Sequence, residues 1–354
     1  MIPAVSPSAR LNILTLERNV PVSATIELTR RCPLACLHCY LPETRGRARA
    51  ARELTTAQWK KILVQLAEAG TLYLVFTGGE PLLRPDLAEL CSYAKKLNFD
   101  VRVFSTGLGL DGDMALSLRK AGVSGFEISF YGRPEVHDGI TGVSGSFARS
   151  FTAARLLKKT GIKVKIKTPL MKGNLAQAGW LRAMAKSEGF EISFDPVLTA
   201  ANDGEASALN LRLSGPQLAR AVNIHGAAPA GPRSEAGPYP LSFDFLCGAG
   251  RNVCAVGPAG ELYPCLQLPV KLGDLTRRKA ADIWKNSAWL KKWRLAGIED
   301  LKACGACPDI EFCSRCPGVS LVEGGDIFAP NKPACEMARA YGKMARESAR
   351  RAVP

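Results

Sequence analysis

The sequence predicts an α/β protein in which helices cover a parallel sheet, followed by a cysteine-rich C-terminal region. Short apolar runs with strand character alternate with amphipathic helical stretches as far as about residue 195. The apolar runs are nearly continuous, which is typical of parallel strands buried on both faces. Eight of the twelve cysteines, in contrast, follow residue 240. This change in composition indicates a second region with its own chemistry.

Six strands and five intervening helices make up the predicted sheet region. The strands are expected over Ala24–Thr29, Leu72–Phe76, Asp100–Phe104, Gly125–Phe130, Ile162–Thr168 and Phe190–Phe194. The helices are expected over Thr55–Ala69, Pro85–Leu97, Asp111–Ala121, Phe147–Thr160 and Leu175–Glu188. Thr55 or Thr56 can cap the first helix, and a glycine follows four of the five as a stop signal. The pattern fits an open doubly wound sheet or a barrel, and in both the active site lies at the carboxyl ends of the strands.

Three segments are expected along the chain, over residues 1–199, 200–240 and 241–354. The middle segment is rich in Gly, Pro and Ala and reads as a linker with one helix over Leu213–Ile224. In the last segment, Val253–Val256 and Glu261–Tyr263 flank a glycine-rich turn and predict a hairpin. Pro333–Arg351 predicts a closing helix.

The hydropathy, cysteine content and charge of the chain favour some classes of protein over others. No apolar run approaches the roughly 20 residues that cross a bilayer, and the N-terminus lacks a signal-peptide core, so a cytoplasmic protein is expected. Twelve cysteines in such a chain indicate metal or redox chemistry rather than disulfides. The formal charge of +15 suits either a basic surface or an acidic partner. Because the basic clusters are not interleaved with aromatics, nucleic acid ranks behind an acidic peptide.

The most informative motif is Cys32, Cys36 and Cys39, with the spacing C-x3-C-x2-C after the first strand. Thiolates are the usual ligands of iron–sulfur clusters. A cube held by three cysteines leaves one iron open to a small molecule. The alternative is a zinc knuckle with His38 as the fourth ligand, although His38 directly precedes Cys39 and would strain a tetrahedral site.

A glycine-rich loop, Gly78-Gly79-Glu80-Pro81, follows the second strand. Two glycines let the backbone approach a ligand closely, and exposed carbonyls there could accept hydrogen bonds from an ammonium group. The alternative is a tight turn between a strand and a helix. Ser105-Thr106-Gly107 follows the third strand and Tyr131-Gly132 the fourth, so all four loops are expected on one rim of the sheet.

This order of motifs resembles the radical S-adenosylmethionine family. The resemblance covers about residues 22–195 and implies a partial (β/α)6 TIM-like barrel. It implies a [4Fe–4S] cluster on Cys32, Cys36 and Cys39, whose electron cleaves S-adenosylmethionine to a radical that takes a hydrogen atom from the substrate. The cofactor-binding residues that it implies are His38 near the adenine, Gly78, Gly79 and Glu80 at the methionine ammonium, and Ser105, Thr106 and Ser129 at the ribose and carboxylate.

Eight C-terminal cysteines can form two sites of four thiolates. Their C-x2-C pairs alone also fit zinc ribbons, but the wider pattern resembles the SPASM extension of radical S-adenosylmethionine enzymes, with two auxiliary [4Fe–4S] clusters. The resemblance assigns Cys247, Cys254, Cys265 and Cys316 to the first cluster and Cys304, Cys307, Cys313 and Cys335 to the second. Only two residues separate Cys313 from Cys316, where the family usually has three, which leaves the ownership of Cys316 open. Cys91 remains and is expected to be buried.

The resemblance implies a radical oxidoreductase that modifies a peptide or protein, by crosslinking or oxidation in ribosomal peptide maturation. Leu266 follows Cys265, where sulfatase maturases typically place an aspartate base, so that branch is disfavoured and no catalytic base is assigned. Only about twenty residues precede the first strand, which predicts a separate leader-recognition protein or direct docking of the peptide. An electron donor such as flavodoxin or ferredoxin is expected. The alternatives are a porphyrin-modifying enzyme of an alternative haem pathway and, in another class, a zinc-stapled basic nucleic-acid-binding protein.

Overall fold

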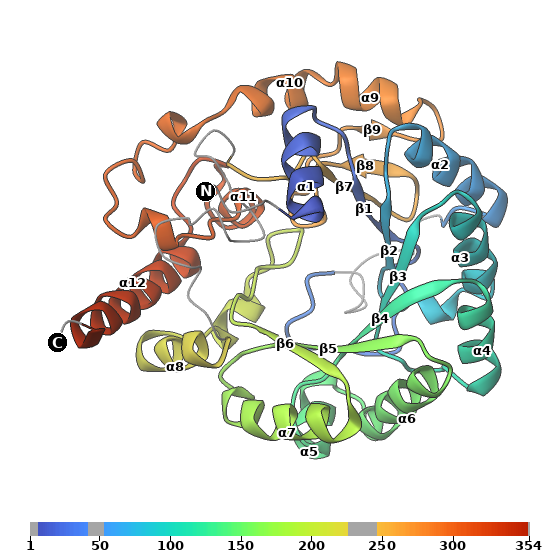
Figure 1. The fold of residues 1–354 in the computed structure, drawn as a ribbon, viewed down its shortest axis with the longest axis horizontal. Coiled ribbons are helices and arrows are strands. Elements are labelled where there is room, and N and C mark those ends of the chain that lie inside the picture. Colours follow the sequence, from blue (N-terminus) through green and yellow to red (C-terminus); the bar gives the residue numbers. More distant parts are fainter. Residues whose placement is uncertain (1–5, 42–52, 226–245, 353–354) are drawn as a thin grey trace.

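The computed structural model describes residues 6–41, 53–225 and 246–352 (Figure 1). Within these ranges, nine strands form one sheet in the order β6-β5-β4-β3-β2-β1-β7-β8-β9. Strands β1 to β6 are parallel to their neighbours. Their bounds are Ser23–Glu27, Tyr73–Thr77, Asp100–Ser105, Val123–Ser129, Lys163–Pro169 and Glu191–Asp195. All six predicted strands are confirmed, and they form an open arc, the partial barrel that the family resemblance implies.

The connecting helices cover the outer face of this arc (Figure 1). They are α2 (Thr56–Glu68), α3 (Leu87–Lys96), α4 (Gly112–Lys120), α6 (Ser146–Lys159) and α7 (Ala178–Glu188). In α2 the buried residues Trp59, Ile62, Leu63 and Leu66 recur at helical spacing, so one face of the helix enters the core. The helices α1 (Pro7–Glu17) and α5 (Pro134–Thr141) were not among the predicted elements.

Two predicted helix boundaries have clear local causes. The Thr55 side chain accepts a hydrogen bond from the backbone of Gln58, whose own side chain accepts one from the Thr55 backbone, a reciprocal capping box that starts α2. Gly189 ends α7 in the left-handed conformation with φ of 64°, which glycine adopts at no steric cost. The predicted cap and stop are therefore confirmed.

The C-terminal region continues the same sheet. β7 (Val253–Val256) pairs in parallel with β1, and β8 (Glu261–Tyr263) and β9 (Gly273–Asp274) follow antiparallel. The other α-helices in the described ranges are α8 (Gly215–His225), α9 (Ala280–Asn286), α10 (Ala288–Leu295), α11 (Pro317–Gly324) and α12 (Lys332–Ala352). The predicted hairpin and closing helix are confirmed, but the pairing of β7 with β1 was not predicted. The end of the predicted linker and its boundary at residue 240 lie outside the described residues. No helix in the described ranges has the length and apolar character needed to cross a bilayer.

Candidate functional site

The three cysteines of the C-x3-C-x2-C motif lie on one loop beyond the end of β1. Backbone hydrogen bonds fasten this loop to the end of α5, from Ala35 to the Thr141 carbonyl at 2.9 Å and from Leu37 to the Ile140 carbonyl at 3.0 Å. The Cys39 amide also donates to the Cys36 carbonyl at 3.1 Å. Helix α5 therefore holds the loop at the rim where the parallel strands end.

The thiols of this loop lie close enough to affect one another. Burial, with a contribution from the nearby Cys39 thiol, raises the pKa of both Cys32 and Cys36 to about 12. Such thiols remain protonated at neutral pH unless a metal displaces the protons. None of the three forms a disulfide, and all three are partly exposed. A soft sulfur donor set that can be reached from solvent fits an iron–sulfur cluster.

The glycine loop after β2 packs directly on the chain segment that leads to the cysteines. The Gly79 amide donates to the Thr29 carbonyl and the Glu80 amide to the Arg31 carbonyl, each at 2.8 Å. A Cβ on Gly78 would lie 2.2 Å from the Thr29 oxygen, and one on Gly79 would lie 2.3 Å from the Arg31 oxygen. Only glycine fits at these two positions, because any side chain would push the ends of β1 and β2 apart.

Glu80 is fully buried, and its carboxylate links the glycine loop to the loop after β3. It accepts hydrogen bonds from the Ser105 hydroxyl and the Thr106 amide at 2.7 Å, from the Leu82 amide at 3.0 Å, and from the Thr106 hydroxyl. Burial raises the pKa of Glu80, and these hydrogen bonds partly oppose the shift. The predicted residues Glu80, Ser105 and Thr106 are thus brought together, and they bind one another.

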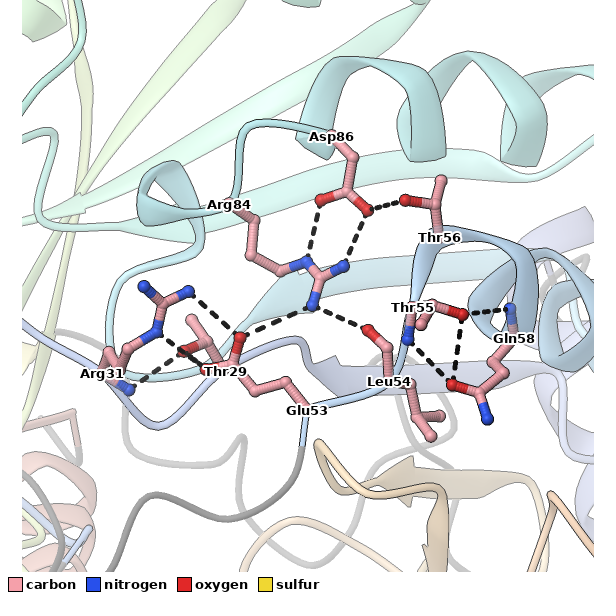
Figure 2. A network of polar contacts seen from close by, with 9 residues as sticks. All are labelled: Thr29, Arg31, Glu53, Leu54, Thr55, Thr56, Gln58, Arg84 and Asp86. Carbon is pink, nitrogen blue, oxygen red and sulfur yellow. Dashed lines mark hydrogen bonds and ion pairs between the residues drawn. The ribbon is translucent and has the colours of Figure 1, made fainter.

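A polar network ties the base of the cysteine loop to the helices behind it (Figure 2). Glu53 accepts two hydrogen bonds from Arg31, at 2.9 and 3.1 Å, and one from the Thr29 hydroxyl. The buried Arg84 forms a paired contact with Asp86 at 2.9 and 2.7 Å and lies 3.6 Å from Glu53. Burial acts to raise the pKa of both carboxyls, but the hydrogen bonds and positive charges outweigh it and lower them.

Tyr131, which the sequence placed only within a rim loop, contacts two predicted site residues. Its hydroxyl interacts with the Cys36 thiol, whose pKa it lowers against the effect of burial, and with Ser129, which lowers the pKa of Tyr131. Its ring meets the His38 ring edge to face, with centroids 4.8 Å apart. The ring of His137, which is 1% exposed, packs against Tyr131 and Phe130. An aromatic at the end of the fourth strand was the only sequence signal for this contact.

The first group of C-terminal thiols gathers around the hairpin and the start of α11. It comprises Cys247, Cys254, Cys265 and Cys316. The Gly250 amide donates to the Pro264 carbonyl at 2.9 Å, and a Cβ on Gly318 would lie 1.8 Å from the Gln267 oxygen. These close approaches bring the turn after Cys247 and the start of α11 against the segment around Cys265. Burial raises the pKa of Cys247 and Cys265, and the neighbouring Cys316 thiol raises both further.

The second group of thiols lies on the loop after α10 and on the first turn of α12. It comprises Cys304, Cys307, Cys313 and Cys335. The Cys307 amide donates to the Cys304 carbonyl at 3.0 Å, and the Cys313 amide to the Ile310 carbonyl at 3.1 Å. Arg346 of α12 pairs with Asp309 at 3.0 Å, which fixes the helix of Cys335 on this loop. Burial raises the pKa of Cys304 and Cys313, and the Cys335 thiol adds to the effect.

Within each of the three described groups, the thiols lie near one another but do not converge on a position that one metal ion could occupy. Among the described residues, no three Cys, His, Asp or Glu side chains are arranged to hold one metal ion. A zinc ion needs four donors at about 2.0–2.3 Å, whereas each cysteine of a [4Fe–4S] cube binds a different iron. Cys91, the remaining cysteine, is buried in α3 as predicted, and burial raises its pKa.

A cavity of about 230 Å³ opens between the end of β1 and the hairpin β7–β8. Its lining includes the charged residues Glu27, Arg30 and Asp203, together with Tyr263 and Leu266. Arg30 lies two residues before Cys32, and Leu266 follows Cys265. The cavity therefore adjoins both the cysteine loop and the first group of C-terminal thiols.

Comparison with known protein families yields two matches. The Radical SAM superfamily matches residues 26–177, and SPASM, an iron-sulfur cluster-binding domain, matches residues 247–317. The chain is similar to a PqqA peptide cyclase of Gluconobacter oxydans, at 30% identity over 76% of each chain. It is also similar to an AdoMet-dependent heme synthase of Methanosarcina barkeri, at 28% identity over 90% of this chain and 97% of the other. A mycofactocin maturase MftC of Mycobacterium tuberculosis is 29% identical over 97% and 90%.

Solved structures share the fold. Streptococcus suis SuiB bound to its precursor peptide SuiA has a TM-score of 0.71 at 15% identity, over 92% of this chain and 79% of that chain. Native anSMEcpe with bound AdoMet has a TM-score of 0.73 at 15% identity, over 93% and 98%. At this identity the likeness concerns the fold.

Proposed function

The chain belongs to the radical SAM superfamily, whose enzymes use S-adenosylmethionine with a [4Fe–4S] cluster, and we propose that it modifies a peptide or protein substrate. It also carries the iron–sulfur SPASM domain. The names of two similar proteins, the PqqA peptide cyclase and the mycofactocin maturase, support a substrate of this class. The observation that carries the proposal is the set of three thiols at the rim of the parallel sheet, beside a glycine loop that packs on their segment.

Cys32, Cys36 and Cys39 are the residues that would hold the cluster. When bound, the cluster supplies the electron that cleaves S-adenosylmethionine to a 5′-deoxyadenosyl radical, which takes a hydrogen atom from the substrate. Tyr131 lowers the pKa of the Cys36 thiol against the effect of burial, which favours its thiolate form. The buried Glu80 fixes the loop after β3 by accepting hydrogen bonds from Ser105 and Thr106.

The predicted cofactor contacts fall into two kinds. Gly78 and Gly79 allow the rim to close around the cysteine segment, and their carbonyls remain the proposed partners of the methionine ammonium. His38 and Ser129, both in contact with Tyr131, remain proposed contacts of the adenine and ribose. The hydroxyls of Ser105 and Thr106 donate to Glu80, so they would offer the cofactor an oxygen acceptor.

We propose two auxiliary [4Fe–4S] clusters, one on each group of C-terminal thiols. The closeness of Gly318 to Gln267 and the mutual effect of Cys316, Cys247 and Cys265 support placing Cys316 in the first cluster. Four cysteines on each cube leave no open iron, which favours electron transfer over substrate binding.

The names of similar proteins support a peptide substrate as the first candidate. The similarity to an AdoMet-dependent heme synthase keeps a porphyrin substrate as the second candidate. Glu27 and Arg30 line the cavity and could orient the polar groups of either substrate.

We also propose partners and a cellular location for the protein. An external one-electron donor such as flavodoxin or ferredoxin would reduce the clusters, and a separate leader-recognition protein could present an acidic peptide to this basic chain. A cytoplasmic location fits oxygen-sensitive clusters and the lack of a membrane-spanning helix in the described residues.

Anaerobic reconstitution with iron and sulfide tests the proposal. We expect about twelve irons per chain, from three cubes of four, and formation of 5′-deoxyadenosine under reductant. Cys36→Ala should remove about four irons and abolish 5′-deoxyadenosine, while Cys91→Ala, the matched control, should leave both unchanged. Two zinc ions without visible absorption would instead support the nucleic-acid-binding alternative, and continued cleavage by Cys36→Ala would exclude this loop as the cluster site.

A further inference from the structure

Arg315 lies on the short connection between the two groups of C-terminal thiols. Cys313 belongs to the second group and Cys316 to the first, and only Ser314 and Arg315 separate them. The spacing between these two cysteines is one residue shorter than is usual in the SPASM family. A side chain on this connection is therefore forced to lie near both groups.

Backbone carbonyls hold the guanidinium of Arg315 in place. Its Nε donates to the Ala329 carbonyl at 3.1 Å, and a terminal nitrogen donates to the Ile327 carbonyl. The Ser320 hydroxyl also donates to the Ala329 carbonyl, at 2.9 Å, so this acceptor is itself anchored. A planar guanidinium with two fixed acceptors loses little further freedom and keeps its charge at one position.

The guanidinium of Arg315 is close enough to thiols of both groups to interact with them electrostatically. It interacts with Cys247 and Cys316 in the first group and with Cys304 and Cys313 in the second. Arg251, in comparison, interacts with Cys247. One half-buried positive charge thus serves two sites at once.

We propose that Arg315 raises the reduction potentials of both auxiliary clusters together. The inference rests on the proposed function, because it requires a cluster on each group of thiols. Reduction adds one electron and hence one negative charge to a cluster. A fixed positive charge nearby stabilises the reduced form more than the oxidised form, and local charge is one of the factors that set the potentials of such clusters.

The test is a redox titration followed by electron paramagnetic resonance. The full chain carries Cys32→Ala, Cys36→Ala and Cys39→Ala, so that only the auxiliary clusters contribute to the signal. Arg315→Gln should lower both potentials, so that each cluster is about tenfold less reduced at a fixed potential, or about 59 mV for a one-electron couple. Arg315→Lys keeps the charge and should restore most of the shift. Arg277→Gln removes a charge from an 84% exposed side chain of the same region and should change neither potential.

The potentials of the variants distinguish a charge effect of Arg315 on both clusters from an effect on one cluster or on cluster binding. A shift of one cluster alone, or an equal shift in Arg315→Lys, would overturn the inference. If Arg315→Gln failed to retain auxiliary iron, Arg315→Lys would decide, since wild-type iron and potentials support the role of charge and a loss of iron overturns it. If the parent chain bound no auxiliary iron at all, the proposed function would fail before any variant was compared.

Discussion

Replacing Gly79 by alanine perturbs the contact between the glycine loop and the cysteine segment with a single methyl group. The added Cβ would lie 2.3 Å from the Arg31 oxygen, 2.7 Å from its carbonyl carbon and 2.8 Å from the Arg30 oxygen. All three are backbone atoms, so no side chain can rotate away. The two segments must separate by about 1 Å to reach an ordinary contact distance near 3.4 Å.

The expected loss of stability follows from the hydrogen bonds that this separation stretches. Two hydrogen bonds of 2.8 Å, from Gly79 to Thr29 and from Glu80 to Arg31, would be stretched, each with a net contribution of about 1 kcal/mol. Overpacking a tight site adds about 1–3 kcal/mol. We therefore expect Gly79→Ala to lower the free energy of unfolding by about 3–5 kcal/mol and to lose most 5′-deoxyadenosine formation, because the cysteine loop starts from Arg31.

Anaerobic urea unfolding and quantification of 5′-deoxyadenosine measure the two effects. Gly139→Ala is the matched control, since Gly139 lies within α5 and a Cβ there would meet no atom within 4 Å. That variant should be about 0.5–1 kcal/mol more stable, as alanine suits a helix better than glycine. If Gly79→Ala kept wild-type stability but lost cofactor cleavage, the glycine would face the ligand rather than the backbone, and the reasoning would be refuted.

Two further substitutions probe buried titratable and charged side chains near the site. Neither ring nitrogen of His137 has a hydrogen-bond partner in the described structure, and burial lowers its pKa to about 4. Acidification from about pH 6.5 to 4 should therefore lower the free energy of unfolding by up to about 3 kcal/mol, because the unfolded chain takes up a proton that the folded protein does not. His137→Phe should abolish this contribution to the pH dependence of stability, as measured by denaturant titrations at several pH values. Arg84→Met removes the charged partner of the half-buried Asp86 and should cost about 3 kcal/mol. Since Arg84 lowers the Asp86 pKa, acid unfolding of this variant should begin at a higher pH. The control is Arg102→Met, which removes an exposed ion pair with Asp100 and should lower the free energy of unfolding by less than about 1 kcal/mol.

The sequence predicted the sheet region well because its signals are local. Capping by Thr55 and a stop at Gly189 depend on neighbouring residues, and the apolar strands are separated by helices with one buried face. The motifs after the strands were expected on one rim for the same reason, since parallel strands end at the same edge. The assignment of individual ligands stays a prediction, although Glu80 proves to hold the loop after β3.

The missed features depend on contacts between distant parts of the chain. The glycine loop carries two glycines, and nothing in that pattern reveals that the Thr29 and Arg31 carbonyls occupy the space of their side chains. Tyr131 and His137 gave no periodic signal because their contacts come from packing of the loops after β4 and around α5. Nor does a short spacing between Cys313 and Cys316 say which thiols surround Arg315.

The pairing of β7 with β1 explains how two cofactor sites can keep a fixed separation. Cys254 of β7 lies in register with Ala24 of β1, and the same strand continues into the loop of Cys32. Ala24 and Cys254 are both fully buried, so their strands cannot slide past one another without exposing core residues. The cysteine loop and the first group of C-terminal thiols are therefore carried by two adjacent strands of one sheet, with the cavity between them. A rigid connection of this kind favours electron transfer, which depends on distance, over a flexible arrangement of two independent domains.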